Sequence, residues 1–195
     1  MLGSGFGFTG IAIADDSEEP ITECTVIDES GSYVLDGDLP VDGDADQECL
    51  RVEASDVEID GQNNTISTDA DDGIKVAAET SNILIENVEF NDLERGIDVR
   101  ETEDLTIRDN VFTDGSGEAI DINSDVSNVT IEGNEVDDWD GGVIVGASPT
   151  SIDGLEIRDN TFEGMISSPA DETIDITSDN VEDAIIDDNE FIDND

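Results

Sequence analysis

The segment Asp104-Leu-Thr-Ile-Arg-Asp-Asn-Val-Phe112 contains the pattern that decides the fold of this chain. Apolar and polar residues alternate through Leu105-Thr-Ile107, which is the period of a β-strand with one buried face. The pattern recurs along the chain, and its strand isoleucines lie 26, 22, 24, 26 and 29 residues apart, at Ile59, Ile85, Ile107, Ile131, Ile157 and Ile186. A repeat of this length built from short strands predicts a solenoid.

Each repeat contains two further apolar elements. A second strand begins at Leu50, Ile74, Ile97, Ile120, Val143 and Ile174, and its first four spacings are 24, 23, 23 and 23 residues. A third apolar position follows the first strand at Ile66, Phe90, Phe112, Val136, Phe162 and Phe191. We therefore predict an all-β, single-stranded parallel β-helix of about six coils over residues 49–195. Residues 24–48 are expected to form an atypical first coil that covers its open end.

A column of asparagines lies between the first strand and the third apolar position. It consists of Asn110, Asn134, Asn160 and Asn189, with Gln62 and Val88 at the same place in earlier coils. Asparagine tolerates the left-handed conformation that a sharp turn needs, and stacked amides hydrogen-bond to one another. We predict that these residues form the turns and connect neighbouring coils.

These segments, with Ser127-Asn-Val-Thr-Ile-Glu-Gly-Asn134, resemble the right-handed parallel β-helix repeats of the pectin-lyase-like superfamily. The opening Cys24 … Tyr33-Val-Leu35 … Cys49-Leu-Arg-Val52 is similar to secreted haloarchaeal members. The resemblance implies right-handed coiling, and it implies that active members hold their catalytic groups on an outward sheet face. It leaves the activity open, because the superfamily includes lyases, hydrolases, epimerases and non-catalytic surface proteins.

The charge of the chain is extreme. The sequence has 54 Asp and Glu residues against 6 Lys and Arg residues, a net charge of −48. Such a chain repels itself unless dense salt screens it, so we predict a high-salt environment. No basic patch is available to displace counterions from nucleic acid, and an anionic membrane surface is excluded as a partner for the same reason.

The N-terminal region predicts export. Residues 1–14 resemble the end of a truncated signal peptide with an Ala12-x-Ala14 cleavage pattern, although an apolar strand is the alternative; residues 15–23 resemble an acidic linker. No stretch is long enough to span a bilayer. Cys24 and Cys49 are either a disulfide or two buried thiols, and export favours the disulfide. The predicted location is secreted or cell-surface.

Two columns of outward residues run from coil to coil. The first, after the first strand, is Asp60, Glu86, Arg108, Glu132, Arg158 and Asp187, and from Glu86 its charges alternate in sign, which predicts a ladder of ion pairs. The second is Arg51, Lys75, Asp98, Asp121, Ile144 and Asp175. Lys75 is expected to pair with Asp98. Asp98 and Asp121 are like charges about one coil apart, which is the arrangement of a glycosidase pair or of a screened acidic surface.

Candidate catalytic residues are therefore Asp98 and Asp121, with Arg100 or Lys75 as the neighbouring cation, and Arg51 and Arg95 are further cations nearby. Histidine is absent, so a histidine base and a Ser-His-Asp triad are excluded. Two cysteines do not make a four-ligand zinc site. Asp42, Asp44 and Asp46 partly match a calcium loop, but Gln47 stands where an EF-hand requires glycine, so only a loose Ca²⁺ or Na⁺ site is predicted.

Trp139, the only tryptophan, lies between Asp138 and Asp140 in a turn, and the equivalent turn one coil later is a longer loop that contains Met165. An exposed Trp139 is suited to stacking on a sugar ring. The alternative is that Trp139 packs beneath the longer loop beside Met165, as lone aromatic residues are mostly buried. Two glycosylation sequons occur at Asn63 and Asn128.

Two classes of function remain after these exclusions. The first is a non-catalytic secreted or cell-surface scaffold or adhesion module that binds polysaccharide, as a monomer or an end-to-end oligomer. The second is an enzyme on acidic polysaccharides, either a lyase that uses Ca²⁺ or a hydrolase that uses Asp98 and Asp121. The short length of the chain and the loss of basic residues to ion pairs favour the scaffold.

Overall fold

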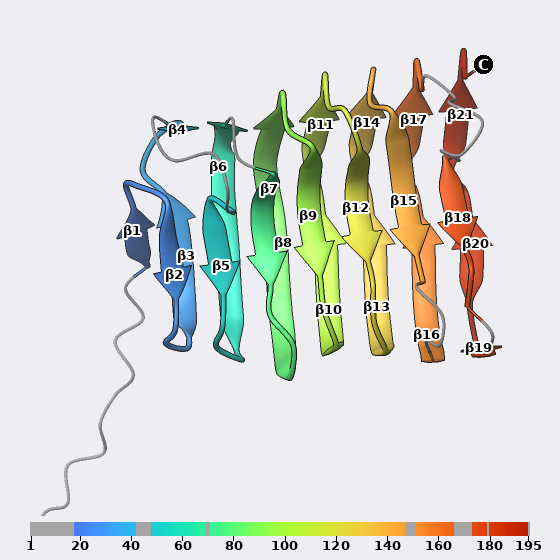
Figure 1. Cartoon of the computed structure of the whole chain (residues 1–195), viewed down its shortest axis with the longest axis horizontal. Coiled ribbons are helices and arrows are strands. Elements are labelled where there is room, and N and C mark those ends of the chain that lie inside the picture. The colour runs from blue at the N-terminus through green and yellow to red at the C-terminus, as the bar shows by residue number, and fades with distance from the viewer. Residues whose placement is uncertain are drawn as a thin grey trace, which may run out of the picture.

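Every regular element in the described part of the chain is a β-strand, and all strand pairs are parallel (Figure 1). The computed structural model describes residues 18–41, 48–68, 71–146, 151–165, 173–178 and 180–194. Over these ranges, no helix is long and apolar enough to cross a membrane.

Two parallel sheets wind along one axis, so that each coil adds strands to both (Figure 1). The seven-stranded sheet consists of β2 (Thr25–Ile27), β5 (Leu50–Val52), β7 (Asp72–Val76), β9 (Arg95–Val99), β12 (Glu118–Ile122), β15 (Gly141–Val145) and β18 (Ile174–Ile176). The other sheet has 14 described strands: β1 (Glu19–Ile21), β3 (Gly31–Leu35), β4 (Leu39–Val41), β6 (Val57–Thr68), β8 (Thr80–Asn91), β10 (Thr102–Arg108), β11 (Val111–Thr113), β13 (Val126–Glu132), β14 (Glu135–Asp137), β16 (Ser151–Arg158), β17 (Thr161–Glu163), β19 (Asn180–Glu182), β20 (Ile185–Asp187) and β21 (Glu190–Ile192). The predicted parallel β-helix is confirmed.

Equivalent residues of successive coils stack in the core. Ile85, Ile107, Ile131 and Ile157 are register partners in turn, and all are fully buried. The rings of Phe90 and Phe112 stack in the same way, with centroids 4.7 Å apart. Burial of each such side chain contributes about 1.5–3 kcal/mol, so the apolar repeat stabilises the contact between coils.

The asparagine column forms the predicted hydrogen-bonded ladder. The Asn110 amide donates to Asn134 Oδ1 (3.1 Å), Asn134 donates to Asn160 (3.0 Å), and Asn160 donates to Asn189 (2.9 Å). The predicted left-handed conformation is wrong for these residues, because it belongs to the residue before each one: Asp109, Gly133, Asp159 and Asp188. In each turn, therefore, one residue adopts the left-handed conformation and the following asparagine makes the hydrogen bonds. The buried Asn110 amide, for example, donates to the Ile85 backbone carbonyl at 3.1 Å.

The place of Gln62 in this column was also wrong. Asn64, not Gln62, is the register partner of Val88, because β6 carries two more residues than β8 between Asp60 and Asn64. Asn64 donates to the Leu35 carbonyl at 2.8 Å, as an asparagine of the column does. The extra residues Gln62 and Asn63 are exposed and both have positive φ.

The N-terminal boundary differs from the prediction. β1 pairs with β3 and buries Ile21, so residues 19–21 belong to the sheet and not to a linker over 15–23. The predicted signal peptide at 1–14 lies outside the described residues. Cys24 and Cys49 form the predicted disulfide, with Cα atoms 4.6 Å apart, between the starts of β2 and β5. This bond is consistent with an oxidising, extracellular environment.

Candidate functional site: a cationic face over buried carboxylates

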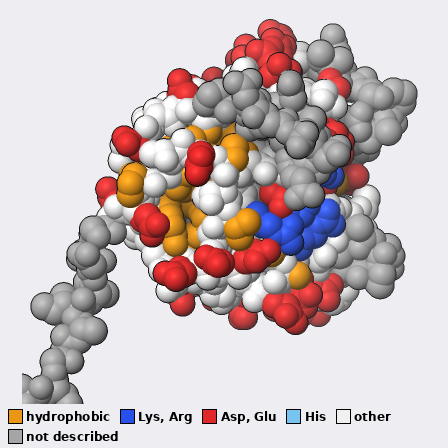
Figure 2. Space-filling view, turned by 60° about the vertical axis from the view of Figure 1, so that its left-hand side comes forward, with side chains coloured by type: hydrophobic (Ala, Val, Ile, Leu, Met, Phe, Trp, Pro, Cys, Tyr) orange, Lys and Arg blue, Asp and Glu red, His pale blue; other side chains and the backbone are white. Residues whose placement is uncertain are grey.

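Four of the 6 basic residues lie on one face of the seven-stranded sheet. Arg51 is in β5, Lys75 is in β7, Arg95 begins β9 and Arg100 follows it. We call these four residues the cationic face. Figure 2 shows Lys and Arg side chains as one blue patch among red carboxylates. In a chain with a net charge of −48, this is a marked concentration of basic residues, although each of them is paired with one or more carboxylates.

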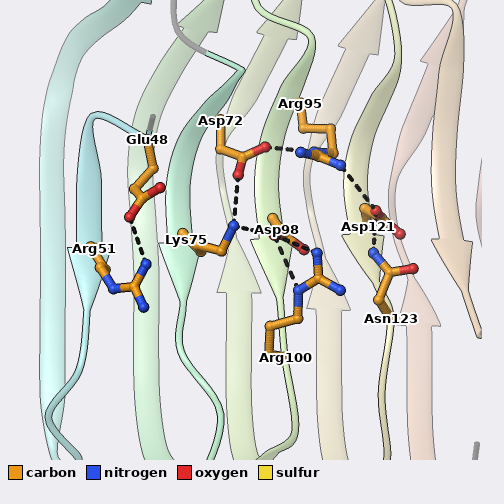
Figure 3. Close-up of polar contacts among 9 residues, drawn as sticks. All are labelled: Glu48, Arg51, Asp72, Lys75, Arg95, Asp98, Arg100, Asp121 and Asn123. Atoms are coloured by element: carbon orange, nitrogen blue, oxygen red, sulfur yellow. Dashed lines mark hydrogen bonds and ion pairs between the residues drawn. The ribbon is translucent and has the colours of Figure 1, made fainter. Parts of the chain in front are cut away.

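Asp98 lies at the centre of the face (Figure 3). Its Oδ2 contacts Lys75 Nζ at 3.0 Å and Arg100 Nη2 at 3.0 Å. The Asp98 side chain is 0% exposed, and its Oδ1 has no hydrogen-bond partner among the described residues. Burial lowers the pKa of Lys75, but the hydrogen bond and charge of Asp98, and then Asp72, outweigh burial and raise it. Lys75 is therefore a fixed cation, not a proton acceptor.

Two further buried carboxylates extend the network along the helix axis. Asp72 contacts Lys75 at 3.2 Å and Arg95 at 2.5 Å. Arg95 also lies 3.9 Å from Asp121, which accepts a hydrogen bond from Asn123 (Figure 3). Burial raises the pKa of Asp121, the Asn123 hydrogen bond lowers it, and the charge of Asp98 raises it again, so that the net direction is upward.

Two arginines of the face are partly exposed and three of its carboxylates are buried, although Glu53, whose side chain is 46% exposed, pairs with Arg51 at 2.6 Å. The side chains of Arg51 and Arg100 are 38% and 37% exposed, whereas Asp72, Asp98 and Asp121 are nearly inaccessible. The predicted set of Asp98, Asp121 and Arg100 is brought together, since Asp98 and Asp121 are register partners on β9 and β12. The two carboxylates nevertheless do not face solvent as an open pair. Lys75 and Arg100 form ion pairs with Asp98, and Arg95 forms an ion pair with Asp121.

The remaining two arginines have the structural role predicted for them. Arg108 pairs with Glu86 at 2.6 Å, and Arg158 pairs with Glu132, in the outward column of the other sheet. Each arginine thus lies between acidic register partners in neighbouring coils. Two ion pairs of the predicted ladder are confirmed. Arg108 and Arg158 also provide a reference surface of the same residue type as Arg51 and Arg100 and of similar exposure.

Trp139 is buried, as the second of the two interpretations expects, although residues 166–172 of the longer loop lie outside the described residues. Its side chain is 0% exposed and packs edge-on against Phe112, with centroids 5.8 Å apart. Met165 is also buried, Asp138 is exposed and Asp140 is half-buried. The ring therefore presents no face to a sugar, and the predicted binding set of Trp139, Asp138, Asp140 and Met165 is not an exposed platform.

Gly115 makes room for Trp139, and this gives a stability prediction. A Cβ at position 115 would lie 1.9 Å from Trp139 Cε2. We expect Gly115→Ala to lower the free energy of unfolding by about 1–3 kcal/mol or more, because the indole ring must shift in a packed core. Gly31→Ala is the matched control, since its Cβ would meet Tyr33 at an ordinary 3.6 Å. Equal urea midpoints for the two variants would contradict this packing.

The predicted cation site at Asp42, Asp44 and Asp46 lies outside the described residues. Within the part of the chain that the structure describes, no group of three or more Cys, Asp or Glu residues is arranged to hold a metal ion. A groove of about 360 Å³ beside β8, β10, β13 and β16 is lined by Glu79, Glu101, Glu103, Asp125 and Asp153, among others. It is acidic and therefore does not suit an anionic polymer.

Sequence reasoning found the four cations and two of the buried acids, but it missed Glu48, Asp72 and Asn123. Asp72 begins β7, one coil before Arg95, and the two are register partners. This alignment is visible in the second-strand repeat, which places Asp72 two residues before Ile74 as it places Arg95 two residues before Ile97. Glu48 pairs with Arg51 at 2.9 Å and stands two residues before Leu50, which is the place that Asp72 holds before Ile74, so the same alignment also indicates Glu48.

Comparison with known proteins gives a family match. A family model described as a right handed beta helix region matches residues 4–163 and, a second time, residues 80–195. Comparison with curated proteins and with solved structures found no match. The match covers the coils that hold the cationic face and agrees with right-handed coiling.

Proposed function

Because the chain belongs to the right-handed β-helix family, we propose that it is an exported, non-catalytic scaffold whose cationic face binds a carboxylate-bearing polysaccharide. The observation that carries the proposal is the gathering of Arg51, Lys75, Arg95 and Arg100 on one sheet face of a chain with a net charge of −48. The disulfide between Cys24 and Cys49 supports export.

The charge distribution supports an anionic ligand at this face and disfavours one elsewhere. Carboxylates repel an acidic polymer over most of the surface. At the cationic face, the exposed arginines retain guanidinium N–H groups that are suited to bidentate contact with carboxylates. Successive coils are about 4.8 Å apart, so Arg51 and Lys75, which are on neighbouring strands, form a row along the axis. A linear polymer with repeated carboxylates fits such a row.

The burial of the acids supports binding without cleavage. A hydrolase needs two carboxyl groups that reach the scissile bond, whereas Asp98 is fully buried beneath Lys75 and Arg100. One observation favours the enzymatic alternative. Asp121 has a raised pKa, which is a property of general acids, so a polysaccharide hydrolase or lyase is the second candidate.

A polymer panel separates the two candidates. In concentrated KCl, we expect the folded protein to bind a linear polyuronate and not the same polymer after its carboxyl groups have been reduced to alcohols. New reducing ends and unsaturated products should not appear, with or without Ca²⁺. Turnover that is lost in Asp121→Asn would instead identify an enzyme, and equal binding of both polymers would refute recognition of carboxylates.

A further inference from the structure

Asn63 is an exposed asparagine in the 14-stranded sheet, which is not the sheet that holds the cationic face. Asn63 lies in the two-residue enlargement of β6, between Asp60 and Asn64, where the register with β8 shifts. It is exposed and has a φ of 59°. The turn that holds Asn63 is therefore two residues longer than the equivalent turn of the next coil.

The hydrogen bonds of the other asparagines set Asn63 apart. Among the asparagines that the structure describes, Asn63 alone has a side-chain amide that donates no hydrogen bond; donors are Asn64, Asn82, Asn87, Asn91, Asn110, Asn123, Asn128, Asn134, Asn160, Asn180, Asn189 and Asn194. The other asparagines are thus structural parts of the helix, and Asn63 is available for chemistry.

The residues around Asn63 meet the requirement for N-linked glycosylation. Asn63-Asn64-Thr65 is a sequon without proline at its middle position. The second sequon begins at Asn128, but the Asn128 amide donates to Asp104 Oδ1 at 3.0 Å. A Cβ on Gly154, in the coil on the other side, would lie 3.1 Å from Asn128 Oδ1. Asn128 is also exposed, but its amide is bonded to the preceding coil and its oxygen lies close to Gly154 of the next, so a glycan there would break a contact of the repeat.

We propose that Asn63 is N-glycosylated and that Asn128 is not. The donor would be an oligosaccharide linked through phosphate to a lipid, handled by a transferase in the export compartment. Asn63 Nδ2 would form a bond to the anomeric carbon of the first sugar, the bond from that carbon to the phosphate oxygen would break, the lipid phosphate would leave, and the amide would lose one proton. No oxidant or reductant is needed.

The position of the glycan leaves the cationic face open. Asn63 is on β6 of the 14-stranded sheet, whereas Arg51, Lys75 and Arg95 are on the seven-stranded sheet. The glycan would add a hydrated group to the turn at Gln62 and Asn63, beside the Asp60 carboxylate. The glycosylation proposal rests on the export that the proposed function includes, but it does not depend on polysaccharide binding, so glycosylation and binding can each fail without the other.

Peptide mass spectrometry of the protein isolated from its natural source tests the proposal. Cleavage after Lys and Arg separates the two sequons, into the peptides 52–75 and 109–158. We expect a sugar mass on peptide 52–75 that is lost in Asn63→Gln and in Thr65→Ala and kept in Thr65→Ser, while peptide 109–158 stays unmodified. A bare peptide 52–75, or a glycan on Asn128, would overturn the proposal. Polyuronate binding by Asn63→Gln should equal that of the unaltered protein.

Discussion

Replacing Asp98 by Asn is expected to lower the free energy of unfolding by about 3–5 kcal/mol. Asp98 is fully buried and its Oδ2 holds both Lys75 and Arg100 at 3.0 Å. The amide removes the negative charge that compensates these cations. Arg100 then has no carboxylate partner within the described network, and Lys75 keeps only Asp72 at 3.2 Å. The loss is large because the Asp98 carboxylate that both cations contact is shielded from water.

The same substitution at the neighbouring register position should have the opposite outcome. Asp121→Asn keeps an oxygen that accepts the Asn123 hydrogen bond, and it removes a charge whose burial and whose repulsion by Asp98 raise its pKa. A carboxyl group with a raised pKa in the folded state costs stability as the pH rises. The cost is absent below the ordinary Asp pKa and complete above the raised one. Asp121→Asn should therefore equal or exceed the unaltered protein in stability at neutral pH.

Urea unfolding in concentrated KCl, at neutral pH and at acidic pH, measures both effects. The advantage of Asp121→Asn should disappear as the pH falls below the ordinary Asp value, because the unaltered Asp121 is then protonated in both states. Equal losses of stability in Asp98→Asn and Asp121→Asn would contradict the assignment of Asp98 as the paired carboxylate.

Removal of salt is expected to unfold the protein completely. The net charge of −48 is carried on coils about 4.8 Å apart, and like charges such as Asp60 and Glu86 are register partners. The Debye length grows from about 3 Å at 1 M to about 30 Å at 0.01 M salt. In dilute buffer each carboxylate therefore repels those of several coils, whereas only 6 basic residues oppose this repulsion.

The buried tryptophan provides the measurement. Trp139 is the only tryptophan and is 0% exposed, so unfolding moves its fluorescence from an apolar to an aqueous environment. Dialysis into dilute buffer should shift the emission to the red, and KCl should restore it. Sucrose at the same osmolarity is the control, because it does not screen charge. Unchanged emission and near-UV circular dichroism after dialysis would refute the role of screening.

The sequence predicts the coils well because each coil contains the same alternation of buried apolar and exposed polar residues. Ile107 and Ile131 each lie in a strand where apolar and polar residues alternate. The recurrence of this alternation at a fixed spacing is typical of strands that stack in a solenoid. The columns of outward charges follow directly from that register, which is why the Arg108 and Arg158 pairs and the Lys75–Asp98 pair were predictable.

What the repeat does not contain could not be predicted. Trp139 fits in the core because Gly115 in the preceding coil has no side chain. Other glycines, such as Gly96 beside Phe112, make room for rings at other places in the coil, so the repeat does not specify which glycine accommodates Trp139. The burial of Asp98 depends on the reach of Arg100 and Lys75, which strand spacing does not specify. The repeat also does not show that Asp109, and not Asn110, takes the left-handed conformation, because Asp and Asn both tolerate it.

A comparison of two charge-matched double variants tests the central claim most directly. Arg51→Gln/Arg100→Gln removes the two most exposed cations of the cationic face, and Arg108→Gln/Arg158→Gln removes the same charge from the other sheet at similar exposure. Polyuronate titrations of both folded variants in KCl should show binding that is at least about tenfold weaker for the first pair, equivalent to about 1.4 kcal/mol, and nearly unchanged for the second. Equal weakening of both pairs, or of neither, would contradict a binding role for the cationic face.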